Sequence, residues 1–100
     1  MTRTALYVQL EAKPGKEQQV AAFLKDAQQM VEAEPKTTAW FAMKMGPTTF
    51  GIFDAFNDET GRDAHLKGKV ADALMKQAPD LFTNKPEIHK LDILADKLPH

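Results

Sequence analysis

The sequence predicts an α+β fold in which two helices cover one face of a four-stranded antiparallel sheet. Two observations predict it. A largely apolar stretch over residues 37–56 is interrupted once, by Gly46-Pro47, and is rich in β-branched and aromatic residues, which is typical of a hairpin of two strands. On each side of this hairpin lie one amphipathic helical pattern and one shorter strand pattern. The order strand, helix, strand, strand, helix, strand is that of the ferredoxin-like βαββαβ fold.

Each element has its own signal in the 100 residues, which we expect to form one domain spanning residues 1–100. Alternation predicts the strands, and apolar residues at helical spacing predict the helices. Pro35 and Pro79 are expected to end the two helices, and Asp58 to cap the second. Gly68 is a weak point where that helix is expected to kink or to meet a close neighbour. The predicted elements are strands at 4–12, 38–45, 48–56 and 86–95 and helices at 16–34 and 59–78.

Both faces of the predicted hairpin are apolar. A sheet with one face in water should alternate cleanly between apolar and polar residues, and these two strands do not. Helices can cover one face only, so we expect the other face to meet a second copy of the chain or a ligand. A contiguous apolar patch of this size predicts a two-fold homodimer in which the open sheet faces meet.

Composition excludes several classes of function. Thirteen basic and fourteen acidic residues give a net charge of -1, which argues against a nucleic-acid binder. No stretch approaches the ~20 apolar residues of a membrane span, so no membrane partner is expected. The first residues lack the apolar core of a signal peptide and the chain has no cysteine, so a cytoplasmic location is predicted. The chain has no cysteine and no serine, which excludes these nucleophiles and thiolate metal sites. No carboxylate and histidine cluster has metal-ligand spacing, so no metal site is predicted.

Three histidines are the strongest candidates for chemistry. His65 lies beside the core position Leu66 in the second predicted helix, where it is either a general base or ligand contact or a histidine at the helix surface. His89 lies on an apolar strand face and is expected to be hydrogen-bonded and structural. His100 ends the chain, and we expect it to be mobile.

Other polar or aromatic residues interrupt the strands. Trp40 is either a core anchor or the wall of an aromatic pocket. Tyr7 and Gln9 share a strand face, where they could hydrogen-bond a substrate or a dimer partner. Asp54 and Lys44 each interrupt an apolar strand face, and a cross-strand ion pair could satisfy both charges.

Four segments carry a resemblance to a known family: EAKPGKE at 11–17, EAEP at 32–35, TFGIFDAFNDE at 49–59 and AHL at 64–66. With them the chain resembles the antibiotic biosynthesis monooxygenase family of dimeric α/β-barrel proteins. The resemblance implies a ferredoxin-like chain whose sheet pairs with a second copy to form a barrel. It also implies a pocket between the sheet and the helices.

Characterised relatives oxidise quinols, anthrones and similar aromatics with molecular oxygen and without metal or flavin, so the resemblance implies no cofactor. Such substrates reduce oxygen themselves once deprotonated, and the protein need only bind them, exclude water and accept a proton. The histidine of the AHL motif carries over to His65, as a pocket base or hydrogen-bonding group. Other relatives bind haem through a later histidine, which residues 66–74 do not contain.

The resulting hypothesis is a cofactor-independent monooxygenase that acts on a small aromatic or quinol. His65 is the predicted base, Trp40 and Phe53 are predicted pocket walls, and Tyr7 or Gln9 is a predicted orienting group. The alternative is a non-catalytic dimeric protein of the same fold that binds a small molecule or serves a stress response. Haem binding is a third and weaker possibility.

Overall fold

A computed structural model describes residues 2–98, and the predicted order of elements is confirmed, with one helix divided in two. The prediction for His100 lies outside the described residues. Predicted and observed strand ends differ by one residue in the first three strands and by up to three in the last. The elements are β1 (Thr4–Glu11), α1 (Glu17–Glu32), β2 (Thr37–Lys44), β3 (Thr49–Phe56), α2 (Glu59–Leu66), α3 (Lys69–Leu81) and β4 (Glu87–Asp92).

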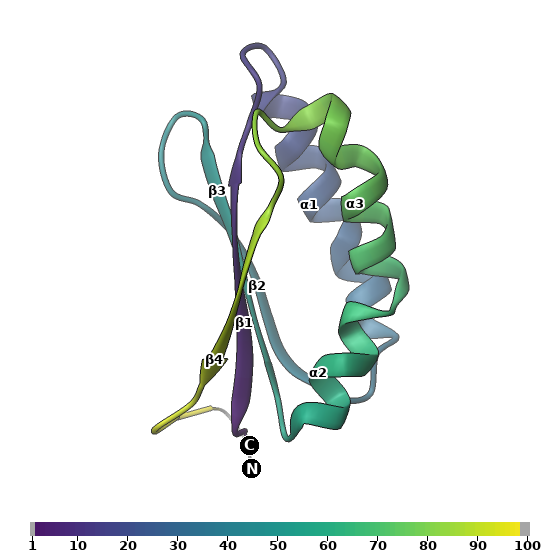
Figure 1. Cartoon of the computed structure of the whole chain (residues 1–100), viewed down its shortest axis with the longest axis vertical. Coiled ribbons are helices and arrows are strands. Elements are labelled where there is room, and N and C mark those ends of the chain that lie inside the picture. Colours follow the sequence, from purple (N-terminus) through teal and green to yellow (C-terminus); the bar gives the residue numbers. More distant parts are fainter. Residues whose placement is uncertain (1, 99–100) are drawn as a thin grey trace.

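The sheet is antiparallel, with strand order β2-β3-β1-β4. The helices pack on one face of this sheet, and the other face is left open, as Figure 1 shows. This is the predicted ferredoxin-like α+β fold, and its sheet does not close on itself because β2 and β4 form free edges. Within residues 2–98, no helix is both long enough and apolar enough to cross a membrane.

The hydrophobic core lies between the sheet and the helices. Val8 and Leu10 of β1 and Ile52 of β3 face Leu24 of α1 and Leu74 of α3, and all five are buried. Each such side chain contributes about 1.5–3 kcal/mol to stability relative to leaving it in water. The helix-facing side of the sheet is therefore the one that carries Leu6, Val8 and Leu10, a choice that strand alternation alone leaves open.

The open face of the sheet is apolar. Tyr7, Phe53 and Phe41 lie side by side on it, because the register places Tyr7 opposite Phe53 and Phe53 opposite Phe41. Phe41 is 53% exposed, and Met45 just beyond β2 is 52% exposed. This is the surface for which the sequence predicts a second copy of the chain.

The second predicted helix differs from the prediction at two points. It is broken at Lys67 and Gly68 into α2 and α3, and the extended backbone of Gly68 begins α3. The kink expected at Gly68 is thus confirmed as a full break. The predicted stop at Pro79 is wrong, because α3 continues to Leu81. Pro79 lies in the last turn of α3, where its missing N–H removes a single helical hydrogen bond, the one to the carbonyl of Met75.

Candidate functional site

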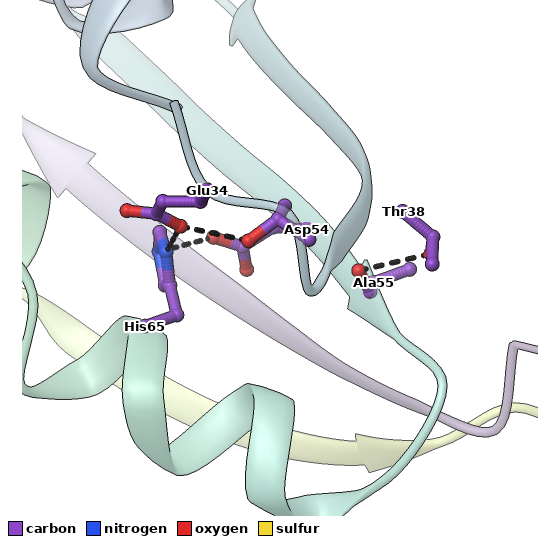
Figure 2. Close-up of polar contacts among 6 residues, drawn as sticks. Glu34, Thr38, Asp54, Ala55 and His65 are labelled. Carbon is purple, nitrogen blue, oxygen red and sulfur yellow. Dashed lines mark hydrogen bonds and ion pairs between the residues drawn. The ribbon is translucent and has the colours of Figure 1, made fainter. Parts of the chain in front are cut away.

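His65 is buried between two carboxylates, and this is the most unusual polar feature of the structure. Its Nδ1 lies 2.6 Å from Oε1 of Glu34, and its Nε2 lies 2.7 Å from Oδ2 of Asp54. Figure 2 shows the imidazole ring in contact with both carboxylates. We call Glu34, His65 and Asp54 the acid–histidine triad. Both ring nitrogens are occupied, which is the arrangement of a protonated imidazole that donates two hydrogen bonds.

Three different elements bring the triad together. Glu34 belongs to the connector between α1 and β2, where it also accepts a hydrogen bond from Thr37 Oγ1 at 2.7 Å. Asp54 lies two residues before the end of β3 on the helix-facing side and is 1% exposed. His65 lies in the last turn of α2, and its ring also packs against Phe56 at a centroid distance of 5.4 Å. The triad therefore ties a connector, a strand and a helix to one another.

Local sequence explains how α2 comes so close. The Asp58 side chain caps α2 by accepting a hydrogen bond from the Gly61 N–H at 3.0 Å, as predicted. A Cβ atom at Gly61 would lie 3.2 Å from both Cβ and the carbonyl oxygen of Lys36 in the connector. Glycine at this position lets α2 pack against the connector, which brings His65 within reach of Glu34.

The pKa of His65 is raised above its ordinary value of 6.5. Burial acts most strongly and would lower it, but the hydrogen bond and charge of Asp54, followed by those of Glu34, together outweigh burial. The imidazole therefore stays protonated at pH values where a free histidine has lost its proton. A protonated imidazole has no lone pair with which to accept a proton from a substrate.

This shift predicts a pH dependence of stability. Because the folded pKa is higher than the unfolded one, the stabilisation is fully present below about pH 6.5 and is lost as pH rises through the folded pKa. The free energy of unfolding is expected to fall over that range by at most about 1.4 kcal/mol per pH unit. Urea titrations between pH 6 and 9 measure it. His65→Gln is expected to flatten the profile, whereas His89→Gln, which alters a half-exposed ring, is expected to leave it unchanged; a profile that stays flat in the wild type contradicts the assignment.

A pocket of about 440 Å³ opens beside the triad, between the connector, α2 and the start of α3. Glu34 is the carboxylate of the triad that lines it, and the Glu34 side chain is 20% exposed. A Cβ atom at Gly68 would lie 3.5 Å from Glu34 Oε2, so glycine leaves this side of the oxygen without a side-chain contact. The remaining walls are mainly apolar or small and are formed by Met30, Ala33, Pro35, Lys36, Thr37, Gly61, Ala64, His65 and Lys69.

The five predicted site residues do not come together within one chain. Trp40 lies on the helix-facing side with His65 but lines a different cavity, of about 530 Å³, between α1 and β2. Phe53, Tyr7 and Gln9 lie on the open face, so the sheet separates them from His65. In one chain, the pocket beside His65 is therefore built without these four residues.

Two further predictions change with the structure. Asp54 pairs with His65, so the expected cross-strand pair with Lys44 is wrong; the register places Asp54 opposite Trp40 instead. His89 lies on the open face, where its ring stacks on Tyr7 at 6.0 Å and its Nε2 lies 3.6 Å from Glu87. Its side chain is 51% exposed, so it is a surface histidine.

Sequence reasoning missed Glu34 and Asp54 as site residues. Glu34 stands in the EAEP segment at 32–35, where its position before Pro35 indicates only the end of a helix, and it lies 31 positions from His65. Asp54 did carry a signal, because it shares a strand face with Phe50, Ile52 and Phe56, and a carboxylate buried among such residues requires a cation. Within residues 2–98, no group of three or more acidic, histidine or cysteine side chains is arranged to hold a metal ion.

Fold and site together define a small ferredoxin-like α+β protein with a carboxylate-flanked histidine at the edge of a pocket. The chain belongs to the same family as the NE2512 protein of Nitrosomonas europaea, described as a protein of unknown function, with which it shares 56% sequence identity over 100% of this chain and 97% of that one, at a TM-score of 0.98.

More distant solved structures share the fold. A Nitrosomonas europaea structure titled "Putative antibiotic biosynthesis monooxygenase" is 14% identical over 92% of this chain and 90% of that one, with a TM-score of 0.82. Rv0793 of Mycobacterium tuberculosis is 15% identical over 94% and 97%, with the same TM-score of 0.82. The resemblance predicted from the sequence is thereby confirmed in the fold. No family model matches the chain. No curated protein matches it either.

Proposed function

We propose that the chain is a cofactor-independent monooxygenase that oxidises an electron-rich phenol or quinol with molecular oxygen in the pocket beside Glu34. One observation carries the proposal: a carboxylate, held in place by a buried imidazole, lines a mainly apolar pocket of about 440 Å³. A pocket of that size suits a small aromatic ligand. The fold shared with structures named as monooxygenases supports the same reaction class.

In the proposed reaction the protein has two tasks, to accept a proton and to bind the ring. The substrate hydroxyl donates its proton to Glu34, and the resulting phenolate carries the electron pair that reduces oxygen. A carbon–oxygen bond forms to give a hydroperoxide, and its O–O bond then breaks. One oxygen atom stays on the ring carbon as a carbonyl, and the other leaves as water with two hydrogens from the substrate. Small apolar walls bind the ring next to Glu34.

In this scheme Glu34 contacts the substrate and His65 positions Glu34. The sequence predicts His65 as the base, but in the structure both of its nitrogens face carboxylates. Its proton fixes the orientation of Glu34 Oε1, while Oε2 points toward the uncovered side of Gly68. Substitution of each residue separately decides between the two assignments.

Oxygen uptake by the purified, metal-free protein tests the proposal. Turnover on a panel of quinols and anthrones is measured with an oxygen electrode, and product mass distinguishes an inserted oxygen from simple dehydrogenation. Uptake with insertion of one oxygen atom is the expected result. The absence of uptake on every compound, together with a small molecule that co-purifies, indicates the second candidate function, a binding protein of this fold. The closed hydrogen bonding of His65 favours that alternative, since the triad could serve only to hold the fold.

Haem is a weaker candidate ligand on the same grounds. An axial ligand needs a free imidazole nitrogen, and both nitrogens of His65 are already bonded. A titration with hemin that leaves the Soret band at its free position would remove this possibility.

A homodimer through the open sheet face belongs to the same proposal. Phe41, Phe53 and Tyr7 form a contiguous apolar surface there, and two such faces can cover one another. Light scattering is expected to give twice the chain mass of 11.2 kDa. Phe41→Glu is expected to give the monomer, whereas Met75→Glu on the helix side, with a similar exposure of 50%, is expected to leave the dimer intact. A wild type with the mass of one chain contradicts the dimer.

A further inference from the structure

Two lysines line the same pocket as Glu34. Lys36 belongs to the connector between α1 and β2, and Lys69 is the first residue of α3. Over the range 2–98, neither of them is among the residues that form ion pairs with carboxylates. Both are exposed to water. The pocket therefore has two cationic groups that are not paired with a carboxylate among the described residues.

Both lysines belong to backbone segments that adjoin Glu34. Lys36 is held against α2, where its Cβ lies 3.2 Å from the position a Cβ would take at Gly61. Lys69 follows Gly68, and a Cβ atom built at Gly68 would lie 3.5 Å from Glu34 Oε2. The two lysines thus belong to different segments, the connector and α3, and both segments adjoin the carboxylate of Glu34. A ligand that contacts Glu34 occupies the pocket that the two lysines also line.

Charge favours a ligand that is itself an anion. Within the triad, the protonated imidazole cancels one of the two carboxylate charges, and one negative charge remains. Adding the two positive charges of the lysines makes the net charge of the groups around the pocket positive. A neutral phenol can hydrogen-bond only to Glu34, whereas a phenol with an acidic substituent can also form ion pairs with the two lysines. Exposed pairs of this kind are each worth about 0.2–1 kcal/mol, which corresponds to a factor of about 1.4–5 in affinity.

We infer that the substrate class of this pocket is a phenol or quinol that carries a carboxylate or similar acidic group, with its hydroxyl on Glu34 and its acid on Lys36 and Lys69. The inference rests on the proposed function for the reaction but on the two lysines for the selectivity. Binding and turnover therefore test different parts of it.

Calorimetric binding of 2,5-dihydroxybenzoate and of its methyl ester tests the selectivity, because the two compounds differ mainly in the negative charge. The acid is expected to bind about 3–10-fold more tightly than the ester at low ionic strength, and the difference is expected to shrink as salt screens the exposed pairs. The variant Lys36→Gln with Lys69→Gln is expected to bind both compounds equally. Lys67→Gln, which removes a nearby charge that does not line the pocket, is the matched control and is expected to keep the difference.

The outcomes separate the inference from the proposed function. Equal affinity for acid and ester in the wild type overturns the inference, and so does the absence of binding by either compound. A preference that survives the double substitution also overturns it, because the lysines then do not cause it. Tighter binding of the acid without oxygen uptake supports the acidic ligand and counts against the monooxygenase. If both compounds are oxidised at the same rate and bound with the same affinity, the proposed monooxygenase activity is supported and the inferred preference for an acidic substrate is wrong.

Discussion

Glu34→Gln is expected to lower kcat/KM for oxygen uptake by a factor of about 10²–10⁴ on any substrate that the wild type oxidises. Glutamine has nearly the same shape as glutamate, but its amide cannot accept the substrate proton. The matched control is Glu32→Gln, which removes an exposed carboxylate two positions earlier that does not line the pocket beside His65. That variant is expected to keep the wild-type rate.

The same experiment decides between Glu34 and His65 as the base. If Glu34 accepts the proton, His65→Gln is expected to weaken activity by displacing the carboxylate, and the pH profile of the remaining activity should change with it. If His65 is the base, as the sequence predicts, Glu34→Gln should retain most of the turnover and His65→Gln should abolish it. Circular dichroism of each variant distinguishes a loss of chemistry from a loss of fold.

Asp54→Ala is expected to lower the free energy of unfolding by about 3–5 kcal/mol, because it leaves a buried imidazolium without its most enclosed partner. That is a large share of the roughly 5–15 kcal/mol that stabilises a domain of this size. Urea denaturation at pH 6.5 measures the change.

Two comparisons make the Asp54 measurement specific. Asp72→Ala breaks an exposed pair with Lys76 at 3.0 Å, where both side chains are more than half exposed, and is expected to cost at most about 1 kcal/mol. Asp54→Asn keeps a hydrogen-bond acceptor for His65 and is expected to recover part of the loss, so a measurable variant exists even if Asp54→Ala does not fold. A cost for Asp54→Ala no larger than that for Asp72→Ala would show that the triad contributes little to stability.

The fold could be predicted because its signals are local. Alternation placed β1, and the unbroken helical spacing from Val20 to Val31 placed α1. The end of α3 could not be predicted in the same way, since Pro79 was expected to stop the helix. A proline near the end of a helix removes a single hydrogen bond, and water can replace that bond at an exposed carbonyl.

The site was predicted only in part because its contacts connect distant parts of the chain. His65 was recognisable as a titratable residue beside a core position. Its two partners come from a connector and a strand, and periodicity does not show which side chains will meet across a sheet and a helix. Alternation shows which residues share a strand face but not which face meets the helices. The sequence therefore predicts Tyr7, Gln9 and Phe53 beside His65, although they lie on the opposite side of the sheet.

The break at Gly68 separates α2 from α3, and the two helices are held in place by different kinds of contact. α3 buries Val70, Leu74, Ala78 and Leu81, which are ordinary core residues. The buried residues of α2 are instead Gly61, Arg62 and His65, so this helix is held mainly by caps, close backbone packing and ionic contacts. Substitutions on α2 can therefore reshape the pocket while the hydrophobic core stays intact. For directed evolution, α2 offers a pocket-lining position outside the hydrophobic core at Ala64, whereas Gly61 and His65 have to be kept because they hold α2 against the connector and β3.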